Sequence, residues 1–130
     1  MIVGCGIDVV EIARVERAIS RRGERFRRRV FTEAERRDCE RRARPGPHFA
    51  LRFAAKEAGM KAIGTGWRRG VGWRDFEVVE RSGALELRLH GHAARFAAER
   101  GSARAWLGAS RTRTHAVAQV VLEAVGGRGA

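Results

Sequence analysis

Residues 48–66 read HFALRFAAKEAGMKAIGTG, an Ala-rich segment that ends in Gly-Thr-Gly. This composition predicts a helix from about His48 to Ile63, stopped by the glycines that follow it. Four apolar side chains recur along the segment at helical spacing: Phe49, Phe53, Met60 and Ile63. One face of this helix is therefore expected to be buried.

The start of the chain, IVGCGIDVV at residues 2–10, has the alternating pattern of a β-strand. The face that carries Asp8 also carries Gly4 and Gly6, which leave room for another backbone or a ligand to come close. The opposite face is formed by Val3, Cys5, Ile7 and Val9.

Two further helices are predicted between this strand and the Ala-rich segment. The first runs from Glu11 to about Arg22 and is interrupted at Gly23, with three residues turned to the core: Ile12, Val15 and Ile19. The second begins at the capping-box sequence Thr32-Glu33-Ala34-Glu35. We expect Pro45-Gly46-Pro47 to end it.

The second half of the chain is predicted to be mostly strands. After a loop at 67–73, a hairpin is expected from strands 75–80 and 84–90, joined at Ser82-Gly83. A short helix at 92–100 follows, and then strands at 103–110 and 115–124. The whole pattern predicts one α+β domain over residues 1–125, with a disordered tail at 126–130.

The net charge is +12, and every basic residue except Lys56 and Lys61 is an arginine. Such a surface attracts polyanions of any kind, including nucleic acid, acidic proteins and nucleotide phosphates. A GC-rich genome is an alternative source of the arginine excess. The two lysines depart from that bias and lie five residues apart in the Ala-rich helix.

Several classes of protein are not expected from this sequence. The apolar runs are too short for a membrane span, and residues 1–10 do not have the pattern of a signal peptide. Cys5 and Cys39 are too few for a disulfide framework or a zinc site. We therefore expect free thiols and a cytoplasmic location.

Two acidic residues are candidates for chemistry. Asp8 ends an apolar strand, and Glu57 lies on or beside the apolar face of its helix, where a lone buried charge would be costly. Together they would suit Mg²⁺, with Lys56 and Lys61 holding phosphate oxygens and residues 64–66 offering backbone N–H groups. The alternatives are a turn role for Asp8 and a Glu57–Lys61 ion pair at i, i+4.

A row of arginines follows the first helix. Arg14, Arg17, Arg21, Arg25 and Arg28 would share one side of a helix if that helix continued through Gly23. This row is either a solvated face or a docking surface for an acidic helix or a nucleic-acid backbone.

Four stretches together resemble the holo-acyl-carrier-protein synthases, which are small single-domain phosphopantetheinyl transferases. The resemblance extends from Met1 to about Glu123 and is most specific in the pairing of Gly-Ile-Asp with Arg-Phe-Ala-Ala-Lys-Glu-Ala. The stretches are GCGIDVVEIARVER at 4–17, FTEAERRDC at 31–39, RFAAKEAGMKAIGTG at 52–66 and AVAQVVLE at 116–123.

The resemblance implies a fold, a reaction and a set of residues. A serine of an apo acyl carrier protein would attack the β-phosphate of coenzyme A and release 3′,5′-ADP. Asp8 and Glu57 match the metal-binding acids of the family, Lys61 matches a phosphate contact, and Gly64, Thr65 and Gly66 match the adjacent turn. Lys56, Glu57 and a metal-bound water are candidates for the group that deprotonates the serine.

The resemblance also implies an assembly and a partner surface. The family usually forms trimers with the coenzyme between neighbouring subunits, and it binds acidic carrier proteins through arginines of the first helix. Arg14 and Arg21 match that surface, which Arg25 and Arg28 would extend. Membrane and nucleic acid are not expected partners on this interpretation.

The sequence departs from the family at three places. Arg111, before Thr112, stands where the family has a histidine near the coenzyme, and Gly108 stands where it has a serine. Gly59 replaces an aromatic residue and would widen the pocket, and Ala84 replaces a proline. Arg111 is expected to reach a phosphate.

Three other functions remain as alternatives. One is a weakened or specialised paralogue of the transferases, and another is a basic nucleic-acid-binding protein, which the few aromatic residues and the lack of a recognition motif disfavour. The third is a non-catalytic carrier-protein adaptor, which would not need Asp8 and Glu57 together.

Overall fold

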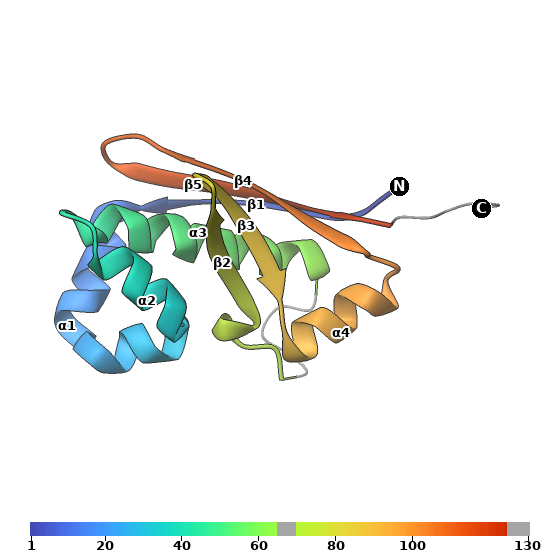
Figure 1. Cartoon of the computed structure of the whole chain (residues 1–130), viewed down its shortest axis with the longest axis horizontal. Helices are drawn as coiled ribbons and strands as arrows, with labels where there is room; N and C mark the ends of the chain where they lie inside the picture. The colour runs from blue at the N-terminus through green and yellow to red at the C-terminus, as the bar shows by residue number, and fades with distance from the viewer. Residues whose placement is uncertain (65–69, 125–130) are drawn as a thin grey trace.

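The computed structural model describes residues 1–64 and 70–124. Its elements follow the predicted α+β order of one strand, then helices, then strands with one further helix among them (Figure 1). In chain order they are β1 (Ile2–Glu11), α1 (Ile12–Val30), α2 (Glu33–Glu40), α3 (Pro45–Ile63), the 3₁₀ turn η1 (Trp73–Asp75), β2 (Phe76–Arg81), β3 (Ala84–Leu89), α4 (Gly91–Glu99), β4 (Arg104–Arg111) and β5 (His115–Glu123).

The strands form two antiparallel sheets. One has the order β1-β5-β4, and the other is the hairpin β2-β3. Figure 1 shows the three-stranded sheet extending along α3, with α1 and α2 gathered at one end of the molecule and α4 at the other. The inner face of the sheet therefore meets α3, while its outer face is left uncovered by the described residues of the chain.

Helix α3 lies against β1 because β1 has glycine where the two backbones meet. A Cβ atom placed on Gly6 would lie 2.1 Å from the carbonyl oxygen of Ala58, and one on Gly4 would lie 2.4 Å from that of Ala62. Both of these neighbours are backbone atoms, which cannot move aside as a flexible side chain can. The facing residues of α3 are buried alanines, so small side chains on both elements set this short separation.

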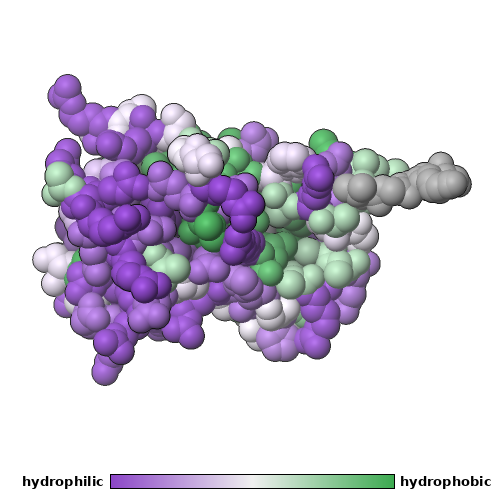
Figure 2. Space-filling view, in the orientation of Figure 1, coloured by the Kyte–Doolittle hydropathy of each residue, from purple (hydrophilic) through white to green (hydrophobic). Residues whose placement is uncertain are grey.

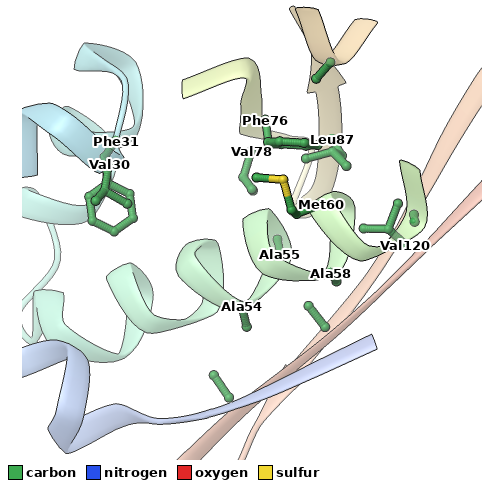
Figure 3. Close-up of a cluster of buried hydrophobic side chains, with 14 of the residues drawn as sticks. Val30, Phe31, Ala54, Ala55, Ala58, Met60, Phe76, Val78, Leu87 and Val120 are labelled. Carbon is green, nitrogen blue, oxygen red and sulfur yellow. The ribbon is translucent and has the colours of Figure 1, made fainter. Parts of the chain in front are cut away.

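The rest of the core is distributed around α3. Figure 3 shows Ala54 and Ala58 on the side of α3 toward the strands, and Met60 on the other side beside Phe76, Val78 and Leu87 of the hairpin. Val30 and Phe31 form part of the core between α1, α2 and α3. All of these side chains are buried, so α3 runs through the centre of the hydrophobic core.

Most boundaries agree with the sequence within about two residues, and the predicted local signals are confirmed. Thr32 and Glu35 form the capping box of α2, and Gly64 ends α3 with a φ of 77°. Ser82 and Gly83 both have positive φ at the hairpin turn. Within the predicted loop at 67–73, residues 70–72 are neither helix nor strand and Trp73 begins η1. Residues 67–69 and the predicted tail at 126–130 lie outside the described residues.

Two predicted boundaries were wrong. Helix α2 ends at Glu40, and Pro45-Gly46-Pro47 begins α3 instead of ending α2. Proline suits the first turn of a helix because the amide hydrogen it lacks would have no partner there. The chain also resumes a helix after Gly23, whose φ of 59° and ψ of −137° make a kink inside α1.

Among the described residues, no helix is both long enough and apolar enough to cross a lipid bilayer.

Replacing Gly6 with alanine is expected to destabilise the fold by roughly 1–3 kcal/mol, because the added methyl group collides with the backbone of α3. Chemical denaturation followed by circular dichroism measures this change. The matched control is Gly72→Ala, since a Cβ on Gly72 meets nothing within 4 Å. An equal unfolding midpoint for Gly6→Ala and wild type would contradict the close approach of α3 to β1.

Candidate active site

A cavity of about 350 Å³ lies where β1, α1 and α3 meet. Its walls include apolar side chains from all three elements, among them Val10, Val15 and Phe53. The charged residues that line it come from the same elements: Asp8, Arg14, Arg22 and Glu57. The cavity therefore brings the two predicted acidic residues together with two arginines.

Asp8 is held in this cavity by the strand and by a lysine. Its side chain is 15% exposed, and its Oδ1 accepts a hydrogen bond of 2.8 Å from Lys61 Nζ. The same ammonium also donates to the carbonyl oxygen of Ile7 at 3.1 Å. The hydrogen bond to Asp8 raises the pKa of Lys61, so the lysine stays charged at neutral pH.

Glu57 faces the same cavity from α3. Burial raises the pKa of its carboxyl group, and the nearby Asp8 carboxylate raises it further. Within residues 1–64 and 70–124, Glu57 has no hydrogen-bond donor. The Glu57–Lys61 ion pair considered as an alternative does not form, because Lys61 pairs with Asp8 instead.

The two carboxylates lie among three cations, Lys61, Arg14 and Arg22, but Glu57 has no hydrogen-bond partner among the described residues. A half-buried carboxylate without a donor is costly unless a cation joins it, and hard oxygen ligands suit Mg²⁺. No group of three or more His, Cys, Asp or Glu side chains able to hold a metal occurs in the described part of the chain. Asp8 and Glu57 therefore fit a Mg²⁺ ion that takes its other ligands from substrate phosphates and water.

The structure places Lys56 away from this site. Its side chain is fully buried, and Nζ donates to Glu35 Oε1 at 2.7 Å, to the carbonyl of Trp73 at 3.3 Å and to that of Phe76. Because all three donors of the ammonium are used, none is free for a phosphate or a serine hydroxyl. This geometry does not support the prediction that Lys56 binds phosphate or acts as the base. Helical spacing alone does not show which element a residue faces.

Of the predicted coenzyme contacts, Lys61 bonds to Asp8 at the cavity, whereas the other described ones do not line it. Gly64 donates its backbone N–H to Met60 at the end of α3, while Thr65 and Gly66 lie outside the described residues. Arg111 is exposed at the end of β4. The pKa of His48 is lowered mainly by burial and further by nearby arginines, Arg111 among them. The two strands β1 and β4 are separated by β5, so Arg111 does not line the cavity of its own chain.

Thr112 serves the turn between β4 and β5. Its hydroxyl oxygen accepts hydrogen bonds from the backbone N–H groups of Thr114, at 3.2 Å, and His115, at 3.1 Å. These bonds fix the direction in which the chain leaves Arg111.

The row of arginines is divided by the kink at Gly23. Arg14 and Arg22 line the cavity, and Arg21 is exposed on the same helical segment. Arg25 and Arg28 follow the kink, so they do not continue one face of a straight helix. Figure 2 nevertheless shows a hydrophilic surface over α1 and α2, where these arginines lie.

Gly59 does not widen the cavity, contrary to the prediction. A Cβ atom at this position would lie 2.7 Å from the ring of Phe76, in the core between α3 and β2. The space that an aromatic residue would occupy is filled by the Phe76 ring.

Sequence reasoning missed two structural contributors. Phe26 lines the cavity beside Phe53, with ring centroids 6.5 Å apart. Arg100 donates to the carbonyls of Ala62, Ile63 and Val3, which joins the end of α3 to β1. The sequence shows that Arg100 lies at the end of the helix predicted at 92–100, but it does not show which distant carbonyl groups accept hydrogen bonds from its side chain.

Comparison with known proteins identifies the family. The family model for the 4'-phosphopantetheinyl transferase superfamily matches residues 4–120. A holo-[acyl-carrier-protein] synthase of Koribacter versatilis is 52% identical over 124 residues, covering 95% of this chain and 99% of the relative.

Solved structures agree with this match and confirm the predicted α+β fold. The synthase of Neisseria meningitidis has a TM-score of 0.84 at 34% identity, covering 95% of this chain and 99% of that one. The synthase of Bacillus anthracis in complex with coenzyme A (3',5'-ADP) has a TM-score of 0.78 at 36% identity, covering 95% and 98%. With the family model spanning most of its length, the chain belongs to the 4'-phosphopantetheinyl transferase superfamily.

Proposed function

We propose that this chain transfers the 4'-phosphopantetheine group from coenzyme A to a serine of an apo acyl carrier protein. The observation that carries the proposal is the pair of carboxylates, Asp8 and Glu57, that line one cavity beside Lys61. Relatives that share about half of the sequence over nearly its whole length are holo-[acyl-carrier-protein] synthases. Neither carboxylate would be needed by a carrier-protein adaptor or a nucleic-acid-binding protein.

The reaction exchanges one phosphorus–oxygen bond for another. The serine oxygen bonds to the β-phosphorus of coenzyme A, the bond from that phosphorus to the bridging oxygen breaks, and 3′,5′-ADP leaves. The serine proton must pass to a base as the new bond forms. Glu57 is the candidate that faces the cavity without a hydrogen-bond donor in the described structure, whereas Lys56 is occupied in the core.

Asp8 and Glu57 would hold Mg²⁺ in this site. When bound, the ion would neutralise charge that develops on the pyrophosphate oxygens during transfer. Lys61 supplies a fixed positive charge next to it: its side chain is 54% exposed, and two of its three donors are used by Asp8 and Ile7. The third donor is free to contact a phosphate oxygen.

The remaining coenzyme contacts are proposed to come from two regions. Gly64, Thr65 and Gly66 begin three residues after Lys61 in the sequence. Arg111 and Thr112 lie at the far edge of the sheet from β1, so they would serve a coenzyme bound between neighbouring subunits.

Such an arrangement requires an oligomer, and we propose a homotrimer. The outer face of the three-stranded sheet exposes large apolar side chains, including Ile7 at 56%, Val9 at 58% and Trp106 at 50%. An apolar sheet face of this kind marks an interface. Sedimentation equilibrium should give three times the mass of one chain, and a purely monomeric protein would contradict the proposal.

We also propose that residues 1–125 form one domain, because a single hydrophobic core surrounds α3. We propose that it acts in the cytoplasm, because Cys5 and Cys39 are free thiols.

The acidic carrier protein is proposed to dock on the arginines of α1. Arg14 lies on the cavity and Arg21, Arg25 and Arg28 are exposed further along α1. A carrier bound there would bring its serine to the mouth of the Asp8–Glu57 cavity. Complementary charge of this kind mainly strengthens encounter and orientation.

The transfer itself is tested by incubating the protein with coenzyme A, Mg²⁺ and an apo carrier protein, then weighing the carrier by mass spectrometry. We expect the mass of one phosphopantetheine group to be added, and none with Asp8→Ala. No added mass with several carriers would refute the proposed reaction. Arg111→Ala should raise the KM for coenzyme A about tenfold, while Arg111→His should raise it less.

Docking is tested by the double variant Arg21→Glu/Arg25→Glu. Repulsion of the acidic carrier should raise its KM by about tenfold or more and change kcat much less. The control Arg81→Glu/Arg88→Glu alters the net charge equally on the β2–β3 hairpin. If both double variants raise the KM alike, total charge and not the α1 surface attracts the carrier.

A further inference from the structure

A buried ion pair stands behind α3, on the side away from the cavity. Lys56 and Glu35 are 0% and 1% exposed, and their charged atoms are 2.7 Å apart. The proposed reaction uses neither residue. Burying two opposite charges costs several kcal/mol of desolvation for each ion, so such a pair adds little to stability compared with apolar residues.

The pair joins three elements at one point. Glu35 Oε1 also accepts from the backbone N–H of Thr32 at 2.8 Å, and its Oε2 accepts from that of Val78 at 2.7 Å. Lys56 adds bonds to the carbonyls of Trp73 and Phe76. The start of α2, the start of β2 and the middle of α3 are therefore held together by directional bonds, which apolar contacts would not supply.

Lys56 and Glu57 are consecutive residues of α3, so their side chains leave the helix about 100° apart. Lys56 points to α2 and β2, while Glu57 points into the cavity toward Asp8. A rotation of this turn of α3 that moved Glu57 away from Asp8 would also pull Lys56 from its acceptors. On the β1 side, alanines and glycines resist closer approach, and Lys61, one turn after Glu57, bonds to Asp8 and to the Ile7 carbonyl. The Lys56–Glu35 pair holds the opposite side of the same helix, so the two sets of bonds together oppose its rotation.

We propose that Lys56 and Glu35 are positioning residues, which fix the rotation of α3 and thereby aim the Glu57 carboxylate at Asp8. This inference rests on the proposed function, because it takes Asp8 and Glu57 as the metal-binding pair. It gives Lys56 an indirect role in the reaction, exerted through the backbone of α3 and without contact to substrate.

The test uses the double variant Lys56→Met/Glu35→Gln, which removes both charges at similar side-chain volume. The glutamine oxygen can still accept from Val78, and its amide group can donate to a carbonyl that Lys56 leaves. Titration with Mn²⁺, followed by electron paramagnetic resonance, should show metal binding about tenfold weaker or more. The kcat should fall by a similar factor, with the KM for the carrier within about threefold of wild type, because the docking surface on α1 is unchanged.

The control is Arg81→Gln/Glu86→Gln, which removes an exposed pair of the β2–β3 hairpin and should leave Mn²⁺ affinity unchanged. If the first variant does not fold, as judged by circular dichroism, Lys56→Arg replaces it. That variant keeps the charge but displaces the donor atoms, and it should also weaken Mn²⁺ binding. The result is read from whichever of the two variants folds. If that variant has Mn²⁺ affinity and kcat within twofold of wild type, the proposal is overturned.

The variant Glu57→Gln distinguishes a failure of the proposed metal site from a failure of the positioning role. If wild type and Glu57→Gln bind Mn²⁺ equally, or if wild type binds none, the proposed metal site is wrong and the positioning role falls with it. If Glu57→Gln loses the metal but the Lys56 variant keeps it, the metal site stands and only the positioning role is wrong.

Discussion

The close contact between the backbones of α3 and β1 sets the positions of both the core and the candidate site. It exists because Gly4 and Gly6 present no side chain to the carbonyls of Ala62 and Ala58. The separation that results puts Asp8, two residues beyond Gly6, within reach of Lys61 and beside Glu57. A larger residue at either glycine would separate two elements whose side chains make up the site. The same contact therefore serves both the stability of the core and the geometry of the proposed reaction.

Charge is distributed differently on the two sides of α3. On the cavity side, two carboxylates lie among Lys61, Arg14 and Arg22, and burial together with repulsion from Asp8 raises the pKa of Glu57. Acidic and basic groups side by side suit a site that receives a cation and phosphates. On the opposite side, Lys56 and Glu35 neutralise each other and satisfy nearby backbone groups. The two lysines that stand out in an arginine-rich sequence thus have separate tasks, one exposed at the site and one buried behind it.

Much of the fold could be predicted because it follows from local rules. Three signals involve only residues close together in the sequence: the capping box at Thr32, the left-handed backbone conformation of Gly64 that ends α3, and the turn at Ser82-Gly83. The site was predicted only in part. Periodicity places a residue on an angle of its helix, but it does not say which element packs there. For this reason the sequence did not distinguish the buried Lys56 from the exposed Lys61, and it assigned Gly59 to the pocket instead of to the contact with Phe76. The break at Gly23 was predicted, but the helix that resumes after it was not. The residue pattern alone identified Asp8 and Glu57 as candidate site residues, and the family resemblance assigned them the role of metal-binding acids.

If α3 and β1 aim two carboxylates at one metal ion bound with the coenzyme, crystals grown with coenzyme A and Mn²⁺ should reveal that ion at a wavelength where manganese scatters anomalously. We expect one strong anomalous peak within about 2.5 Å of carboxylate oxygens of both Asp8 and Glu57, also in contact with a pyrophosphate oxygen. A peak bound to the coenzyme but remote from Glu57, or a coenzyme bound away from this cavity, would rule out the proposed metal site.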